Sequence, residues 1–173
     1  MRAETTRDTV ERLMKEMGAR VRAPGRIYFT GGASAVWYGW RTMTVDVDFK
    51  ADPEPAGFFE ALPRLKEDLQ VNLELASPDN FIPALPGWRD RSRFIARHGQ
   101  LDFYHYDFYG QALAKIERNH PRDRLDVEQM LSHGLIEKDR LLALFNEIEP
   151  LLIRYPALEP ADFRTRVEAF VQP

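Results

Sequence analysis

The sequence predicts an α/β protein (α+β in the stricter sense), with a small mixed β-sheet flanked by helices and followed by a C-terminal helical region. Three observations support this prediction. Strand-like and helix-like segments alternate up to about residue 110, a diglycine separates the first strand from the next helix, and the residues after Gly110 have helical patterns only. We therefore expect an α/β core with an N-terminal helix over residues 1–110, and a helical region over 111–173 that packs on it.

The elements of the core follow from hydrophobic periodicity and from the positions of glycine and proline. Apolar residues at helical spacing predict a helix over 6–18 that ends near Gly18. Strands are predicted over 26–30, 44–49, 70–75, 91–97 and 101–107, and helices over 33–40 and 55–69. In the strand over 44–49, Asp46 and Asp48 alternate with apolar residues, which predicts one polar and one apolar face. The C-terminal helices are predicted over 111–118, 123–132, 137–153 and 161–171.

Composition and charge exclude several classes of protein. The chain has 173 residues, 44% of them apolar and 29% charged, which is globular composition and excludes wholesale disorder. The absence of cysteine excludes disulfides, a thiol nucleophile and Cys-based zinc sites. The net charge of −3, from 24 basic and 27 acidic residues, argues against a general polyanion binder. The start of the chain is charged and no apolar stretch is long enough to span a bilayer, so we expect neither a signal peptide nor a membrane span, and a cytoplasmic location.

The segment from residue 31 to residue 49 carries the pattern with the most chemical content. Gly31 and Gly32, between a strand and a helix, allow backbone amides to approach an anion, and Ser34 adds a hydroxyl in the first helical turn. Asp46 and Asp48 are two residues apart on a strand and point the same way, so both can bind one Mg²⁺ or a Mg²⁺ pair. A phosphate cradle with paired carboxylates is the minimum equipment for metal-assisted phosphoryl or nucleotidyl transfer. Each motif alone has an ordinary explanation, because a lone diglycine is usually a turn and a lone Asp-x-Asp is usually the wet face of an antiparallel strand.

Two blocks of the sequence together resemble a known superfamily. Gly31-Gly32-x-Ser34 followed by Arg41-Thr42-x-Thr44-x-Asp46-x-Asp48-Phe49 resembles the signature of DNA polymerase β-like nucleotidyltransferases. It is closest to the small bacterial branch that includes the AbiEii and MenT toxin-type transferases. The second block, Lys115-x-x-Arg118-x-x-x-Arg122-Asp123-x-x-Asp126, is similar to a later helical motif of that branch. The resemblance spans residues 25–130 and departs at Gly-Gly-Ala-Ser, where much of the branch has Gly-Gly-Thr-Ala, so the hydroxyl of Ser34 comes one residue late.

The resemblance implies a metal-dependent nucleotidyltransferase. Such an enzyme moves an NMP from an NTP such as ATP to an acceptor hydroxyl on tRNA or a protein, and in this branch it is often the toxin of a toxin–antitoxin pair. Mg²⁺, with Mn²⁺ as an alternative, would be held by Asp46 and Asp48. The resemblance also implies a third carboxylate on a later strand. Asp102 is the first candidate to complete the metal site and help activate the acceptor hydroxyl, and Asp107 is the second.

The resemblance further assigns the phosphate contacts. Gly31, Gly32 and Ser34 would cradle the β- and γ-phosphates. Lys115, with Arg118 one turn further along, would contact the triphosphate. The ordinary explanation of Lys115 is a partly exposed, solvated charge.

Other charged and aromatic residues keep two explanations. Four arginines fall on or next to one predicted strand and alternate onto one face: Arg89, Arg91, Arg93 and Arg97. They are either a solvated edge that resists aggregation or a strip for RNA phosphates or a triphosphate. Asp123 is either part of the second motif or a favourable charge at a helix start. Three aromatic residues of the first core helix are core packing or a base-stacking surface, namely Trp37, Tyr38 and Trp40. The four histidines have no ligand spacing, and His105 with Asp107 is only a weak metal alternative.

Two further function classes stay open. The chain can be a non-catalytic nucleotide-binding or interaction module that kept the fold and lost turnover, and a missing third carboxylate would favour this. It can also be a small-molecule nucleotidyltransferase of the aminoglycoside-modifying kind, which would need a wide acidic acceptor pocket.

Overall fold

The computed structural model describes residues 3–173, which separate into two compact units. Unit 1 comprises the described residues up to Ser77 together with Ser92–Tyr106, and unit 2 comprises Pro78–Arg91 and Asp107–Pro173. The α/β fold class is confirmed, because unit 1 holds a mixed β-sheet with helices and unit 2 is helical. Unlike the division expected from the sequence, the helical unit begins at residue 107 and also includes the segment 78–91.

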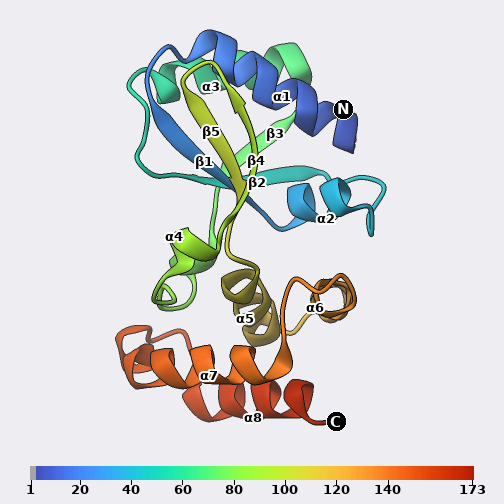
Figure 1. Ribbon diagram of the computed structural model, residues 1–173, viewed down its shortest axis with the longest axis vertical. Helices are drawn as coiled ribbons and strands as arrows, with labels where there is room; N and C mark the ends of the chain where they lie inside the picture. Colours follow the sequence, from blue (N-terminus) through green and yellow to red (C-terminus); the bar gives the residue numbers. More distant parts are fainter. Residues whose placement is uncertain (1–2) are drawn as a thin grey trace. The chain divides into compact units, whose positions relative to one another are not determined.

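Unit 1 is built on a five-stranded sheet in the order β3-β2-β1-β5-β4 (Figure 1). The strands are β1 (Gly25–Thr30), β2 (Asp46–Ala51), β3 (Asn72–Leu75), β4 (Arg93–His98) and β5 (Leu101–His105). The pairs β1–β2 and β4–β5 are antiparallel, whereas β1–β5 and β2–β3 are parallel. Four of these strands lie within the predicted ranges to within one residue, and β2 continues two residues beyond the predicted end at residue 49.

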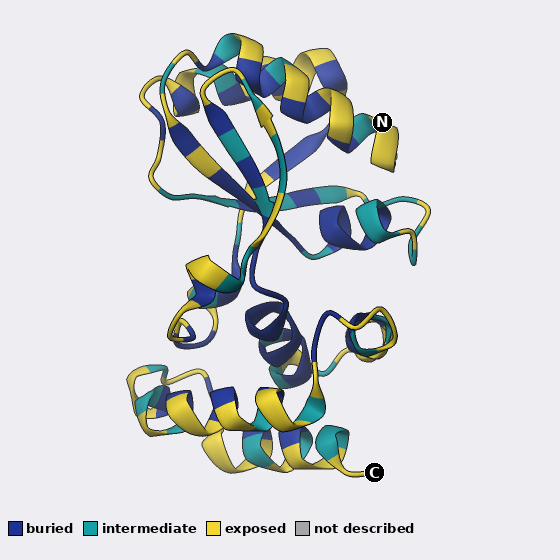
Figure 2. Ribbon diagram, in the orientation of Figure 1, coloured by how far each residue is buried: buried dark blue, intermediate teal, exposed yellow. Residues whose placement is uncertain are grey.

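One face of this sheet is apolar and forms the core of unit 1. Alternate strand residues such as Ile27, Phe29, Val47 and Phe49 pack with apolar side chains of α1 (Arg7–Arg20) and α3 (Phe58–Leu69). Figure 2 shows the resulting buried residues on the sheet and on these helices. The opposite residues of the strands are mostly polar and define a second face, which we call the polar face. Asp46 and Asp48 lie on it, as predicted from their parity with buried neighbours.

The first helix runs two residues past Gly18, the residue near which it is predicted to end. Helix α1 continues to Arg20, and the position of Gly18 reflects packing instead. A Cβ built on Gly18 would lie 2.4 Å from the backbone oxygen of His98, so only glycine allows β4 to approach the helix this closely. A glycine can therefore mark a close contact inside a helix as well as its end.

Unit 2 contains η1 (Pro78–Asn80), α4 (Trp88–Arg91), α5 (Phe108–Arg118), α6 (Pro121–Ser132), α7 (Lys138–Ile148), η2 (Glu149–Arg154) and α8 (Pro160–Val171). Helix α5 is almost entirely buried (Figure 2) and contacts η1, α6, α7 and α8. It begins earlier than predicted because Asp107 caps it, accepting a hydrogen bond from the Tyr109 amide at 3.1 Å. Phe145 and Phe163 join α7 to α8 with ring centroids 4.9 Å apart.

The expected arginine strip on one strand face is wrong. Arg91 belongs to α4, where its guanidinium pairs with the buried carboxylate of Asp107 at 2.8 Å. A β-bulge between Phe94 and Ala96 then shifts the register of β4. As a result Arg93 pairs with His105 and Arg97 pairs with Asp102, two positions that lie on opposite faces of the sheet.

Within residues 3–173, no helix combines the length and hydrophobicity that a membrane span requires.

Candidate active site

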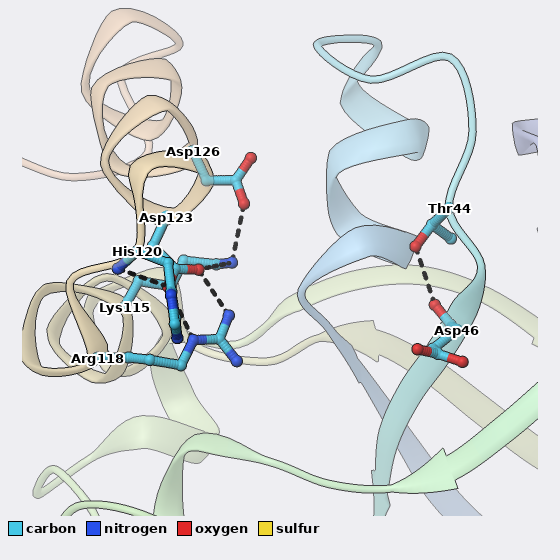
Figure 3. A network of polar contacts seen from close by, with 7 residues as sticks. All are labelled: Thr44, Asp46, Lys115, Arg118, His120, Asp123 and Asp126. Atoms are coloured by element: carbon cyan, nitrogen blue, oxygen red, sulfur yellow. Dashed lines mark hydrogen bonds and ion pairs between the residues drawn. The ribbon is translucent and has the colours of Figure 1, made fainter.

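The candidate site is centred on the first three residues of β2. Asp46 and Asp48 share the polar face of unit 1, and Asp48 lies opposite Thr30 at the end of β1. Just before the strand, Thr44 forms an isolated bridge with Thr5, and its hydroxyl donates to the backbone oxygen of Asp46 at 3.1 Å (Figure 3). These contacts fix the backbone at the start of β2, so the two carboxylates project from an ordered segment.

The diglycine lies directly beside these carboxylates. Gly31 has φ +57°, and a Cβ built there would stand 3.3 Å from Oδ2 of Asp48. A Cβ on Gly32 would stand 2.1 Å from the hydroxyl oxygen of Thr44, so a larger residue would push β2 away. The turn between β1 and α2 (Gly32–Tyr38) is therefore packed against the Thr44–Asp48 segment, which brings the two halves of the first motif together.

A strand that sequence reasoning did not connect to the site supplies two more polar residues. Asn72 and Glu74 lie on β3 opposite Asp46 and Asp48, on the same polar face. The Asn72 amide donates to Oδ1 of Asp46 and, at 2.8 Å, to Oε1 of Glu74. Asn72 therefore orients the Asp46 carboxylate. The alternation of Asn72 and Glu74 with apolar neighbours was the available signal, but their pairing with β2 depends on the parallel register.

Asp102 does not join Asp46 and Asp48. It lies on the polar face but pairs with Arg26, at the beginning of β1, whereas Asp48 pairs with Thr30 at the end of β1. Four residues of strand separate the two positions, which is about 13 Å along the sheet. Its carboxylate instead lies 3.5 Å from the guanidinium of Arg97. The expectation that Asp102 completes the metal site is therefore wrong. Asp107, the second candidate, is committed to Arg91 and to the start of α5.

Ser34 also differs from its expected place. Its side chain is fully buried, 2.9 Å from Nδ1 of His105, and its hydroxyl donates to the Phe29 backbone oxygen at 3.4 Å. A direct phosphate contact by this hydroxyl is contradicted by its burial. Ser34 instead fastens α2 to β5. Burial, together with the charges of Arg93 and Arg7, lowers the pKa of His105 to about 3, so this histidine is neutral near pH 7.

The rings around His105 explain part of the aromatic pattern. The centroid of His105 lies 5.0 Å from that of Tyr38 and 6.2 Å from that of Trp37. Tyr38 stacks on Trp40 at 5.8 Å, and the guanidinium of Arg7 lies over Trp37. These aromatic residues therefore pack α2 within unit 1. The weak metal alternative of His105 with Asp107 has no support, because both groups have other contacts.

The second motif forms a buried charge cluster inside unit 2 (Figure 3). The Lys115 ammonium contacts Asp126 at 2.8 Å and Asp123 at 3.4 Å, and Arg118 contacts both oxygens of Asp123 at 2.6 and 2.7 Å. Burial alone would raise the pKa of Asp123, but Arg118 and Lys115 outweigh it and lower that pKa. The Asp123 carboxylate also accepts a hydrogen bond from the His120 amide at the start of α6. Asp123 therefore also acts as the favourable charge at a helix start that the sequence offered as an alternative explanation.

Lys115 is therefore not the partly exposed charge that the sequence suggested. Its side chain is 11% exposed, and its two ion pairs join α5 to α6. Arg118 is the more accessible cation of the pair, with 58% of its side chain exposed. A contact of either residue with a triphosphate stays a prediction.

Comparison with known families bears on this arrangement. A family model described as a nucleotidyltransferase of unknown function (DUF6036) matches residues 9–172. The chain belongs to this family. No curated protein and no solved structure matches it. Membership of this nucleotidyltransferase family supports the superfamily resemblance but leaves the AbiEii and MenT branch as a hypothesis.

The site of this nucleotidyltransferase family member can be tested for its fit to a metal ion. Among residues 3–173, no group of three or more His, Asp or Glu side chains is placed to hold one. Mg²⁺ does not require such a group, because it is commonly bound by one or two carboxylates, water and substrate phosphates. Asp46 and Asp48 beside the diglycine fit this second arrangement. The donor set is therefore suited to a magnesium ion that arrives with a nucleotide.

Proposed function

We propose that this protein is a metal-dependent nucleotidyltransferase that moves an NMP from an NTP to an acceptor hydroxyl. The observation that carries the proposal is the close approach of Gly31 to Oδ2 of Asp48, which leaves only 3.3 Å for a side-chain atom. A backbone that can approach phosphates thus lies beside a pair of carboxylates that can hold a cation. Membership of the nucleotidyltransferase family supports the same reaction class.

Each residue of the site has a role in this proposal. Asp46 and Asp48 would hold Mg²⁺, or Mn²⁺, and the positive charge of the ion would offset the negative charge of the triphosphate and of the leaving pyrophosphate. The backbone amides of Gly31 and Gly32 bind the β- and γ-phosphates. Asn72 keeps Asp46 oriented. The acceptor oxygen attacks the α-phosphorus, its proton passes to solvent or a nearby base, and the bond to pyrophosphate breaks.

The test is a transfer assay with a matched pair of variants. Wild type, Asp48→Asn and Asp102→Asn are incubated with each α-labelled NTP, Mg²⁺ or Mn²⁺, and total RNA or cell extract. Both changes remove one carboxylate charge from the same sheet face, but only Asp48 lies beside the diglycine. We expect label transfer by wild type and Asp102→Asn, and a loss of at least about 100-fold in Asp48→Asn. Equal transfer by wild type and Asp48→Asn would refute the assignment.

A second candidate is a nucleotide-binding module without turnover. The observation that favours it is the distance of Asp102 from Asp48, together with the lack of a three-acid cluster among the described residues. The two candidates differ in pyrophosphate release. A module without turnover binds NTP with Mg²⁺ but releases no pyrophosphate with any acceptor, and Asp48→Asn then weakens binding only.

The finer parts of the proposal concern acceptor and context. We propose RNA or protein as the acceptor, in the cytoplasm where NTP and Mg²⁺ are plentiful, and an antitoxin partner as in the toxin-type branch. Growth arrest on induced expression of wild type, absent for Asp48→Asn, would support the toxin role. Normal growth with full transfer activity in extracts would exclude it without affecting the reaction class.

A further inference from the structure

The polar face of unit 1 has a second group of residues next to the candidate active site. Its paired side chains form successive rows across the strands. The row with Asp48 contains Thr30 and Glu74. The next row, two residues along β1, contains Lys50, Tyr28, Tyr104 and Phe94. The third row contains Arg26, Asp102 and Arg97.

The aromatic row ends in an exposed ring. Tyr28 and Tyr104 are stacked with centroids 5.1 Å apart, and Phe94 meets Tyr104 edge-on at 5.6 Å. Phe94 is 59% exposed at the edge strand β4, while Tyr28 is buried. The edge-on contact with Tyr104 joins this exposed ring to the stacked tyrosines, and together they form an aromatic platform that reaches solvent.

The arginine row lies beside that platform because of the β-bulge. Phe94 and Arg97 are three residues apart, and in a regular strand they would point to opposite faces. The bulge at Ile95 places both on the polar face, opposite Tyr104 and Asp102. The Arg97 side chain is 61% exposed, and Arg26 is also exposed at the start of β1. Asp102 lies between the two arginines and contacts Arg97 at 3.5 Å.

We propose that Phe94, Tyr104, Arg26 and Arg97, here called the aromatic–arginine strip, bind single-stranded nucleic acid. Aromatic rings stack on bases of any sequence, and adjacent guanidinium groups contact the phosphates of the same strand. The two exposed arginines disfavour an apolar protein partner, and flat rings next to them serve bases better than acidic peptides. Two rows spaced about 7 Å apart suit successive units of an extended strand.

The position of the strip gives it a role in the proposed reaction, and this role rests on the proposed function. The arginine row is about 13 Å from the Asp48 row along β1. A strand bound on the strip has its next nucleotides directed along the same face toward Asp48 and the diglycine. The strip therefore supplies the acceptor strand, which makes nucleic acid rather than protein the acceptor.

The test measures binding without any chemistry. The probe is a fluorescein-labelled, unstructured RNA of about ten nucleotides, and anisotropy is recorded for the full chain at fixed salt. Phe94→Ala and Arg97→Ala are compared with Phe59→Ala and Arg93→Ala. Phe59 is 51% exposed on α3, which covers the apolar face, and Arg93 belongs to β4 but lies on the opposite face from Arg97.

We expect Phe94→Ala to weaken binding about 5- to 160-fold, the range typical of losing one base–aromatic stack. Arg97→Ala is expected to weaken it and to reduce its salt dependence, while the two controls bind like wild type. Melting curves of all variants check the fold, and Phe94→Leu, which keeps apolar surface without a ring, should lose binding as well.

Three results would overturn the inference. They are no binding by wild type, equal loss in the strip variants and their controls, and displacement of the RNA by a mononucleotide at equal concentration. Asp48→Asn should bind the RNA normally while losing transfer. If the protein does not bind RNA but still transfers NMP to another acceptor, the inference fails and the proposed function stands. If it binds RNA through the strip but transfers no NMP, the inference stands and the proposed function fails.

Discussion

The buried His105 should make unit 1 sensitive to acid. Its pKa is about 3 in the folded protein, against an ordinary value of 6.5, because burial and the charges of Arg93 and Arg7 disfavour the imidazolium. Between these two values the unfolded chain binds more protons than the folded one, so the free energy of unfolding rises with pH. The part of that free energy that depends on a neutral His105 is lost progressively as pH falls below 6.5. pH 5 lies about 1.5 pH units below the pKa of histidine in the unfolded chain. This difference lowers the free energy of unfolding at pH 5 by roughly 2 kcal/mol relative to pH 8.

The assay compares wild type with His105→Gln, which cannot titrate but keeps a hydrogen-bonding group for Ser34. Urea unfolding is followed at pH 8 and pH 5 by tryptophan fluorescence. Wild type should lose about 2 kcal/mol more than the variant between these pH values. His133→Gln, a change at an exposed histidine, should retain the wild-type difference. In proton NMR spectra, the imidazole signal that disappears in His105→Gln should not shift between pH 8 and pH 5.

Two outcomes would refute this reasoning. One is an equal pH dependence of stability in wild type and His105→Gln. The other is titration of the His105 signal near pH 6.5, which would mean that the ring is hydrated rather than enclosed by Trp37 and Tyr38. Because His105 contacts Ser34 in α2, its protonation would also loosen the helix that follows the diglycine.

The remaining predictions concern the buried cluster and the site. Lys115→Met should lower the free energy of unfolding by about 3 kcal/mol and the melting temperature by roughly 6–12 °C, because it leaves buried carboxylates without their ammonium partner. Lys15→Met, on the exposed side of α1, should change neither quantity. Equal melting curves for the two variants would contradict the ion-pair assignment. Gly32→Ala should lower the free energy of unfolding, measured in urea, by about 1–3 kcal/mol because the new Cβ would overlap Thr44. Adding Thr44→Gly should restore part of that free energy, whereas additive losses in the double variant would argue against the clash. Asn72→Ala should weaken Mg²⁺-dependent NTP binding about 10-fold, measured by titration of Mg²⁺ at fixed NTP, and unchanged affinity would remove its orienting role.

Local patterns in the sequence predicted most of unit 1. Alternation of polar and apolar residues places Asp46 and Asp48 on one face whatever the strand pairs with, because side chains alternate by geometry alone. The break between β1 and α2 was also predicted locally, from the two glycines, since the positive φ that Gly31 adopts is a local property of the chain. The apolar periodicity of α1 also predicted which of its residues are buried. In α3 the same pattern was right for Phe58, Leu62 and Leu65 but wrong for Phe59, which is 51% exposed.

Longer-range features required the tertiary structure. Alternation assigns Asp102 to a face but not to an end of the sheet, and only the parallel register of β1 and β5 places it opposite Arg26. Likewise, the bulge that separates Arg93 from Arg97 has no fixed signature in the sequence.

The tertiary structure also decided which charged and polar side chains are buried. Lys115 has the spacing of a surface lysine, yet Asp123 and Asp126 from the next helix enclose it. Ser34 follows the diglycine by two residues in the first turn of α2, but β5 brings His105 against it. The sequence by itself therefore determined the local geometry of the carboxylates and glycines. The tertiary structure decided which other groups reach them, because register and packing depend on contacts between residues far apart in the chain.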